Sequence, residues 1–212
     1  MAASDHHDAV VAIMRLAPVI PVLTVRDVAD GVAQARALVA GGLLAIEVTL
    51  RTEAALDAIA EIARSVPGAH VGAGTIVEPA QIDAAIEAGA KFLVSPGTSP
   101  ALAAAASQSP IPFLPGVATP SEAMTLRALG FRALKLFPAE AVGGAKLLAS
   151  IHAPLPDLVF CPTGGIDAAK APAYLALPNV LCVGGSWMLP KGGDYGKIEE
   201  LARAAAGLRA AA

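Results

Sequence analysis

The sequence predicts an α/β fold, a (β/α)₈ TIM barrel with an N-terminal helix, as a single domain over residues 1–212. Three observations lead to this prediction. Short apolar runs alternate with alanine-rich helical stretches, which is the pattern of parallel strands joined by helical crossovers. A repeat of roughly 20–25 residues gives eight such units, in a chain near the lower size range of this barrel. No G-x-G-x-x-G motif follows the first run, which disfavours the alternative of an open doubly wound sheet.

The apolar runs are the predicted strands, and each one precedes a helical stretch along the chain. The first reads PVIPVL and the last VLCVGG. The predicted strands cover residues 18–23, 43–50, 70–76, 91–96, 111–118, 133–137, 158–162 and 180–185.

Residues that cap helices mark several helix boundaries. Asp27 and Asp167 precede helical stretches and offer a side-chain oxygen to the first turn. Thr119–Glu122 reads TPSE, a capping box with proline at the first helical position, and Ser99 also precedes a proline. Gly89 follows its helix, where a left-handed residue commonly ends one. The predicted helices cover residues 28–40, 54–65, 80–88, 100–107, 120–129, 143–151, 168–176 and 197–209.

The composition excludes several classes of protein. With 55% hydrophobic and 16% charged residues, the chain has ample material for a core and is not disordered. Its net charge of -3 and lack of a Lys/Arg cluster disfavour a nucleic-acid partner. Residues 92–121 carry no charge, but the prolines in this stretch disfavour a membrane helix.

Location and cofactors are predicted from the N-terminus, the cysteines and the histidines. The N-terminus has early acidic residues and no basic region, which disfavours a secretory signal. Cys161 and Cys182 lie among apolar residues, as reduced thiols do. We therefore expect a cytoplasmic protein. The histidines are scattered without ligand spacing, so no metal and no cofactor are expected. His6 and His7 are expected in a mobile tail, and His70 at the barrel end away from the chemistry.

Polar side chains gather at the carboxyl ends of the predicted strands, where TIM barrels carry their active sites. They follow or end the second, third, seventh and eighth strands, and a lysine lies within the sixth. These residues are Glu47, Thr49, Arg51, Thr75, Lys135, Thr163 and Ser186.

The alternation of side chains aims two charged residues into the barrel. Lys135 and Phe137 share one face of the sixth strand, while Leu134 and Leu136 share the other and suit the helix-covered outside. The same alternation places Glu47 on the inner face of the second strand. Because the second and sixth strands are opposed in an eight-stranded barrel, the two charges are predicted to face each other.

This pair has two interpretations. A buried salt bridge is one, although such a pair is a weak stabilising device. Imine chemistry is the other, because a neutral amine attacks a carbonyl whereas an ammonium ion does not, and burial favours the neutral amine. The resulting imine withdraws electrons from the adjacent carbon, and a carboxylate such as Glu47 can shuttle the proton.

Two Gly-Gly pairs predict a phosphate site. Residues 163–166 read TGGI after the seventh strand, and residues 184–187 read GGSW after the eighth. Glycines let backbone N–H groups approach an anion closely, and the loops after strands seven and eight are the usual phosphate site of a TIM barrel.

The chain also resembles the KDPG (2-keto-3-deoxy-6-phosphogluconate) aldolase/4-hydroxy-2-oxoglutarate aldolase family over nearly its whole length. The matching segments, in order, are EVTLRT (47–52), VGAGT (71–75), SPG (95–97), PGVATPSE (115–122), KLFPAE (135–140), CPTGGI (161–166) and GGSW (184–187). Mild departures lie in the loop 95–100 and after residue 189, which bear on substrate preference more than on chemistry.

The resemblance implies a role for each matched polar position. Lys135 would form the Schiff base and Glu47 would be the general acid/base. Arg51 and Thr75 would hold the substrate carboxylate. The pyruvyl pocket would be walled by Pro96 and Phe137, substrate hydroxyls would meet Thr163, and the phosphate would be held by Gly164, Gly165, Gly184, Gly185 and Ser186. Members of the family are homotrimers, which implies the same assembly here.

The predicted function is therefore a class I aldolase that cleaves KDPG to pyruvate and glyceraldehyde 3-phosphate. Preference for the galactonate epimer or for 4-hydroxy-2-oxoglutarate is an alternative, although the second compound lacks a phosphate. A phosphate-binding isomerase or epimerase is another alternative, and it would need no lysine inside the barrel. A non-catalytic sugar-phosphate binder is the non-enzymatic alternative, and it would be expected to lack Lys135 or Glu47.

Overall fold

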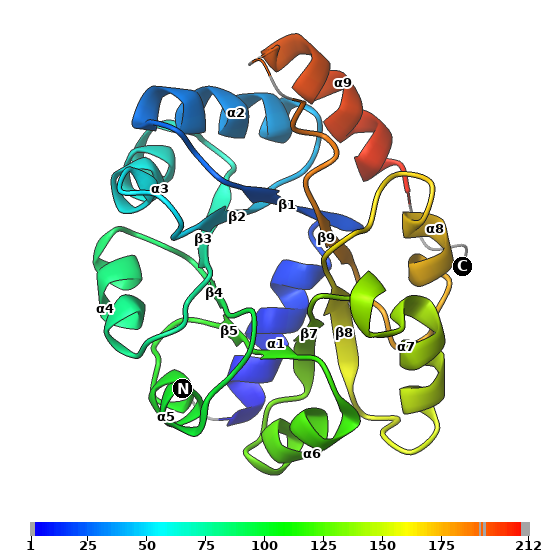
Figure 1. Ribbon diagram of the computed structural model, residues 1–212. Helices are drawn as coiled ribbons and strands as arrows, with labels where there is room; N and C mark the ends of the chain where they lie inside the picture. The colour runs from blue at the N-terminus through cyan, green and yellow to red at the C-terminus, as the bar shows by residue number, and fades with distance from the viewer. Residues whose placement is uncertain (1–2, 191, 193, 209–212) are drawn as a thin grey trace.

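Parallel strands form the inner ring of the protein and helices surround it (Figure 1). A computed structural model describes residues 3–190, 192 and 194–208. Every predicted strand region contains a strand. The strands are β1 Val19–Leu23, β2 Ala45–Thr49, β3 His70–Gly74, β4 Leu93–Val94, β5 Phe113–Leu114, β6 Gly116–Val117, β7 Ala133–Leu136, β8 Val159–Pro162 and β9 Val183–Gly185.

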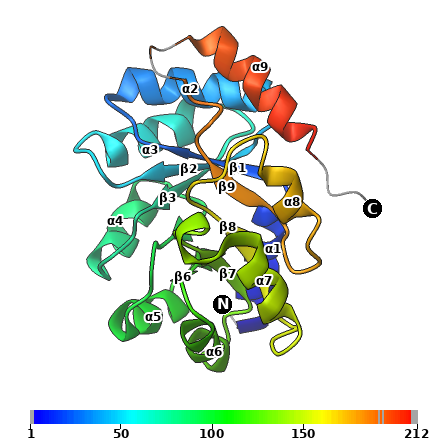
Figure 2. The same ribbon diagram turned by 45° about the vertical axis from the view of Figure 1, so that its right-hand side comes forward.

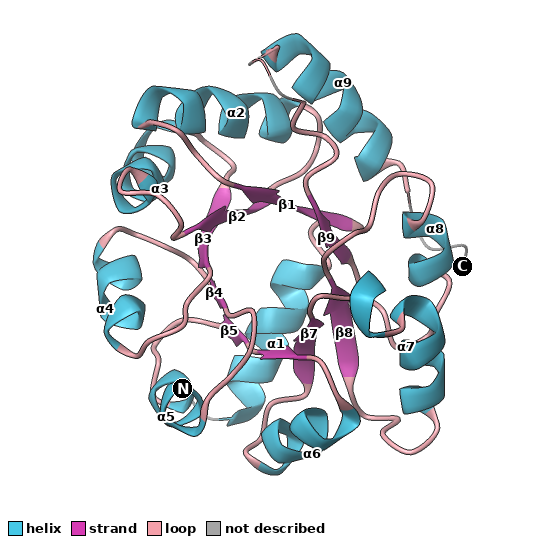
Figure 3. Ribbon diagram, in the orientation of Figure 1, coloured by secondary structure: helices cyan, strands magenta, loops and turns pink. Residues whose placement is uncertain are grey.

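The helices lie outside the strands, with α1 as the exception (Figure 3). They are α1 Ala3–Met14, α2 Val28–Ala40, α3 Ala55–Ser65, α4 Ala80–Glu87, α5 Pro100–Ser107, α6 Pro120–Ala128, α7 Gly144–His152, α8 Ala171–Leu175 and α9 Tyr195–Ala206, with a short 3₁₀ helix, η1, at Glu140–Val142. Helices α2 and α5 have the predicted bounds, whereas α8 is shorter and α9 begins two residues earlier. The predicted end of the last helix, residue 209, lies outside the described residues.

The caps predicted at Asp27, Ser99 and Thr119 are present, whereas Asp167 does not cap α8, because its side chain accepts from the N–H groups of Ala169 and Lys170 ahead of that helix. The Asp27 side chain accepts a hydrogen bond from the N–H of Asp30 at 2.8 Å, and the Ser99 hydroxyl accepts one from Leu102. At the start of α6, Thr119 and Glu122 form a reciprocal capping box. These local bonds satisfy N–H groups that the first turn of a helix leaves free, which is why the boundaries are visible in the sequence.

The prediction of a closed (β/α)₈ TIM barrel is wrong, because the strands do not form one eight-stranded sheet. In the described part of the chain, six strands form an open parallel sheet in the order β5-β4-β3-β2-β1-β9. A separate three-stranded parallel sheet has the order β6-β7-β8. The fold is therefore α/β with an open six-stranded sheet that curves into a half-barrel, and a smaller sheet beside it.

The break between the six-stranded and the three-stranded sheet has a local cause: a proline, and side chains that bond to the backbone in place of a neighbouring strand. The predicted fifth strand is split into β5 and β6 at Pro115, which has no N–H to donate. The N–H of the next residue, Gly116, donates to the Ser95 hydroxyl at 3.0 Å instead of to a strand carbonyl. At the other junction, β8 and β9 form no ladder in the described part of the chain, and two isolated bridges, Phe160–Val180 and Thr163–Gly184, link the segments around them.

Helix α1 covers the end of the strands at which they begin, on the far side of the ring in Figures 1 and 2. Its Val10 and Met14 are buried in the interior cluster together with side chains of the inner strand faces, among them Ala45 and Ala133. His6 belongs to this contact, since its Nε2 accepts a hydrogen bond from the N–H of Phe113 at 2.8 Å. The expectation of a mobile tail at His6 is therefore wrong, and burial lowers the pKa of its imidazole.

Two further properties concern the described residues as a set. None of their helices has both the length and the apolar character needed to cross a membrane. Nowhere among them do three or more His, Cys, Asp or Glu side chains gather in a metal-binding arrangement.

Candidate active site

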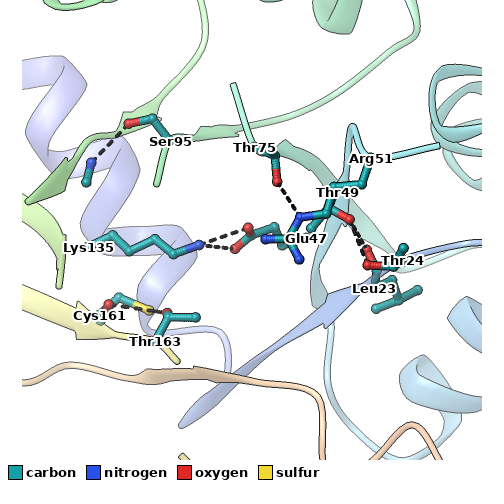
Figure 4. A network of polar contacts seen from close by, with 11 residues as sticks. Leu23, Thr24, Glu47, Thr49, Arg51, Thr75, Ser95, Lys135, Cys161 and Thr163 are labelled. Atoms are coloured by element: carbon teal, nitrogen blue, oxygen red, sulfur yellow. Dashed lines mark hydrogen bonds and ion pairs between the residues drawn. The ribbon is translucent and has the colours of Figure 1, made fainter. Parts of the chain in front are cut away.

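Glu47 and Lys135 face each other across the interior, as the strand alternation predicts. The Lys135 Nζ donates to both carboxylate oxygens of Glu47, at 3.0 Å from Oε1 and 3.2 Å from Oε2 (Figure 4). Both residues are buried, with 3% of Glu47 and 4% of Lys135 exposed. A proton can therefore pass directly between an amine and a carboxylate that little water reaches.

The flanking residues of both strands hold this pair in place. Leu134 and Leu136 of β7, and Ile46 of β2, are fully buried in the outer cluster between strands and helices. Ala133 lies one inward position before Lys135, in the inner cluster above α1. Because a one-residue slip would exchange the two faces, these apolar contacts fix the inward direction of both charged side chains.

Gly74, at the end of β3, leaves the space that the Glu47 side chain occupies. A Cβ atom at Gly74 would lie 2.5 Å from Cγ and 2.7 Å from Cδ of Glu47. Real Cβ contacts are longer than this, so any larger residue would have to move the carboxylate. Gly74 is thus a positioning residue for Glu47, which the sequence motif VGAGT did not reveal.

Replacing Gly74 by alanine is expected to lower kcat by about 10–100-fold, because a displacement near 1 Å of a reacting group has that effect. Steady-state kinetics of the purified, folded variant would measure this. Gly72→Ala is the matched control, since Gly72 pairs with Glu47 along the ladder but its Cβ would meet the Phe92 ring at 2.5 Å and not the Glu47 side chain. Both variants should be less stable, but only Gly74→Ala should lose kcat. An equal loss in both would refute the positioning role.

Arg51 and Thr75 meet beside the pair, at the carboxyl ends of β2 and β3. The Arg51 Nε donates to the Thr75 hydroxyl at 3.2 Å. Thr75 has a φ of 62°, a left-handed conformation that is strained for a β-branched residue. Such strain is common in ligand-binding residues. The sequence placed both side chains at this edge but could not indicate the backbone conformation.

Two threonines, Thr24 and Thr49, connect the carboxyl ends of β1 and β2 next to Arg51. The Thr49 hydroxyl donates to the carbonyl of Leu23 at 2.8 Å and lies 3.0 Å from the Thr24 hydroxyl (Figure 4). Thr24 is a site residue that sequence reasoning missed. Arg51 and Thr24 line a cavity of about 520 Å³ that also reaches Ser186 of the last glycine loop.

Of the three predicted pocket residues Phe137, Pro96 and Thr163, Phe137 contacts the lysine. The Lys135 Nζ lies 5.6 Å from the centre of the Phe137 ring, on the same face of the chain. Thr163 is buried and pairs in an isolated bridge with Gly184. Pro96 lies against the backbone of Gly116, the ladder partner of Lys135.

Ser95 and Thr98 are structural residues that the sequence did not single out. Ser95 accepts from the Gly116 N–H, and the Thr98 hydroxyl donates to the Gly116 carbonyl at 3.0 Å. Together they replace both ladder bonds of Gly116. The segment SPG was part of the family pattern, and this clamp gives it a physical reason.

The two glycine loops need glycine for different reasons. Gly164 and Gly165 have φ values of 104° and 78°, which glycine adopts without strain. Gly184 is fixed by its neighbour, since a Cβ there would lie 2.9 Å from the methyl carbon of Thr163. A Cβ at Gly185 would overlap the Trp187 ring. In the second loop, glycine is therefore required by packing against Thr163 and Trp187.

Comparisons with known proteins identify the family of the chain. Residues 10–201 match the aldolase family described as KDPG and KHG aldolase. The KHG/KDPG aldolase of Escherichia coli K12 is 49% identical over 198 residues, which cover 92% of this chain and 93% of that protein.

Solved structures agree as well. The KDPG aldolase of Zymomonas mobilis ZM4, solved with 3-phosphoglycerate, superposes with a TM-score of 0.93 at 47% identity, covering 97% of this chain and 98% of that one. The KDPG aldolase of Legionella pneumophila, in which pyruvate was captured as a covalent carbinolamine, gives 0.91 at 41% identity, covering 93% and 98%. The chain belongs to the KDPG and KHG aldolase family.

Proposed function

We propose that the protein is a class I aldolase that cleaves KDPG to pyruvate and glyceraldehyde 3-phosphate through a Schiff base on Lys135. The observation that carries this proposal is the buried Lys135–Glu47 pair, with Nζ and Oε1 3.0 Å apart. A lysine that only stabilised the fold would gain little from this place, because desolvation offsets the attraction between buried charges. The named relatives, all aldolases, support the same reading.

The reaction needs one nucleophile and one proton carrier. Glu47 accepts a proton from Lys135, and the neutral amine attacks the C2 ketone. Glu47 then returns this proton to the hydroxyl of the carbinolamine, which leaves as water, giving the protonated imine and an ionised Glu47. Glu47, through a water molecule, then removes the proton of the C4 hydroxyl. The electrons of the C3–C4 bond move into the imine, which gives an enamine and releases glyceraldehyde 3-phosphate. Protonation at C3 and hydrolysis release pyruvate and restore the amine.

The remaining residues bind the substrate in this proposal. Arg51, which lines the cavity, and Thr75, which accepts a hydrogen bond from Arg51, hold the carboxylate. Phe137 and Pro96 wall the pyruvyl portion, and Thr163 meets substrate hydroxyls. The backbone donors around residues 164–165 and 184–186 hold the phosphate, which a glycine backbone approaches closely.

Substrate preference is tested by comparing kcat/KM for KDPG, its galactonate epimer and 4-hydroxy-2-oxoglutarate. KDPG is expected to give the highest value, because it carries the phosphate that the two glycine loops suit. The name KHG/KDPG aldolase of the Escherichia coli relative favours measurable activity on 4-hydroxy-2-oxoglutarate as well. Equal values for the two epimers would contradict the gluconate preference, and no cleavage of any of the three would contradict the function.

We also propose a cytoplasmic homotrimer in which each chain is a single catalytic domain. The family resemblance supports the trimer, and the reduced state expected for Cys161 and Cys182 supports the cytoplasm. Light scattering coupled to size-exclusion chromatography would measure the assembly directly.

A further inference from the structure

A second polar cluster lies behind the first glycine loop, outside the Lys135–Glu47 pair. Glu140 follows β7 in η1, Lys170 precedes α8, and Tyr174 lies within α8. The Tyr174 hydroxyl donates to one carboxylate oxygen of Glu140, and the Lys170 Nζ lies 3.1 Å from the other. Tyr174 is 2% exposed, so its hydroxyl is held in a fixed place. These two donors hold the pKa of Glu140 below its usual value.

Three successive carbonyl groups of the loop are bonded on this side, one by the Lys170 side chain and two by the backbone N–H groups of Ala139 and Glu140. The Lys170 Nζ donates to the carbonyl of Gly165 at 2.7 Å, and the N–H of Glu140 donates to that of Gly164 at 3.1 Å. The N–H of Ala139 donates to the carbonyl of Thr163 at 2.8 Å. The fit is close, since a Cβ at Gly165 would lie 2.8 Å from Cγ of Glu140.

Because the carbonyl groups of the loop are bonded within the protein, its backbone N–H groups are the ones left to bind a ligand. Within the described part of the chain, the N–H groups of Gly164 and Gly165 donate to no other residue. A loop whose carbonyls are bonded and whose N–H groups are free is arranged to bind an anion. Tilting the loop by releasing a carbonyl would instead turn oxygen atoms toward that anion.

The charge of Glu140 argues for a role in geometry. A carboxylate beside an anion site repels the anion, so a residue selected for attraction alone would not be acidic. Here the carboxylate is occupied by Tyr174 and Lys170, and the positive Lys170 offsets its charge. What the carboxylate contributes is a fixed point that positions Lys170 against the Gly165 carbonyl.

We propose that Glu140, Lys170 and Tyr174 form a positioning triad that sets the loop 163–166 for phosphate and so determines preference for phosphorylated substrates. This inference rests on the proposed function for its choice of substrate. None of the three residues takes part in bond cleavage. Their effect falls on binding of the phosphate end, and the imine chemistry at Lys135 is independent of them.

The central experiment is Lys170→Met, with Lys197→Met as the matched control. Both lysine side chains are 45% exposed and ion-paired to a glutamate, but Lys197 pairs with Glu200 in α9. In Lys170→Met the KM for KDPG is expected to rise about tenfold with kcat nearly unchanged, the effect of losing one charge-assisted hydrogen bond. The KM for unphosphorylated 4-hydroxy-2-oxoglutarate should change less than about twofold, and Lys197→Met should leave both unchanged.

Glu140→Gln separates positioning from simple charge attraction. If only charge mattered, removing Glu140 would strengthen phosphate binding while removing Lys170 would weaken it. Positioning predicts that both substitutions weaken it, and that Tyr174→Phe does so too. Isothermal titration with inorganic phosphate measures this without turnover, and thermal unfolding verifies that each variant is folded.

The outcomes are distinguishable. Tighter phosphate binding by Glu140→Gln, or equal KM increases for the phosphorylated and unphosphorylated substrates in Lys170→Met, would overturn the triad. Failure of the unsubstituted protein to cleave KDPG would overturn the proposed function instead, and the phosphate titrations would still decide whether the triad positions the loop.

Discussion

Sodium borohydride added to the protein with pyruvate is expected to leave one stable adduct, on Lys135. Pyruvate condenses with the neutral amine, and reduction of the imine converts the side chain to N-(1-carboxyethyl)lysine. Lys135 is favoured over every other described lysine because it is buried and has a proton acceptor 3.0 Å away. Peptide mass mapping after proteolysis would locate the label.

Lys135→Met should abolish labelling and lower kcat/KM for KDPG by about 10⁴-fold or more, the order of loss when a covalent nucleophile is removed. The control is Lys91→Met, at an exposed position at the start of the β4 region. This variant should keep both the labelling of Lys135 and the kcat/KM for KDPG. Labelling that persists in Lys135→Met, or that maps to another lysine, would contradict the Schiff-base mechanism.

Removing only one charge of the pair has a separate effect on stability. Lys135→Met leaves Glu47 buried without its partner, and breaking a buried ion pair in this way costs about 3–5 kcal/mol. The double variant Lys135→Met/Glu47→Gln should recover part of this free energy of unfolding while remaining inactive. Thermal or denaturant unfolding of the unsubstituted protein, Lys135→Met, Glu47→Gln and the double variant separates the loss of chemistry from the loss of stability.

The positions of the charged residues could be predicted from the sequence because they depend on local rules. The alternation of side chains along a strand places Lys135 and Glu47 on the inward faces of their strands, even though β7 and β2 belong to different sheets, and the facing pair in the structure confirms this prediction. The capping box at Thr119 is equally local, because all of its bonds lie within four residues.

Contacts between distant segments could not be predicted in the same way. Closure of the barrel depends on which backbone groups meet across segments, and the exchange at Gly116, where Ser95 takes the place of a ladder carbonyl, is invisible in an apolar pattern. The sequence predicts a mobile tail at His6, because the residue to which it bonds, Phe113, is 107 residues away and no local pattern indicates this contact. The space at Gly74 and the strain at Thr75 likewise exist only once β2 and β3 are paired.

Glu47→Gln is expected to lower kcat for KDPG cleavage by about 10²–10⁴-fold, because an amide cannot accept the C4 hydroxyl proton. Glutamine keeps the size of the side chain, so it still fits against Gly74. Exchange of the C3 protons of pyruvate in deuterated water, followed by NMR, should fall in parallel, since protonation and deprotonation of the enamine use the same group.

The adduct with borohydride should still form on Lys135 in Glu47→Gln, but more slowly, because the nucleophile is intact and only its proton acceptor is lost. Glu47→Asp retains a carboxylate at a greater distance from Nζ and should recover part of kcat through an intervening water. Glu53→Gln, at an exposed position soon after β2, serves as the control and should behave like the unsubstituted protein. Full kcat and full proton exchange in Glu47→Gln would assign the proton transfer to another group, and Glu47 would then be only the buried counter-charge of Lys135.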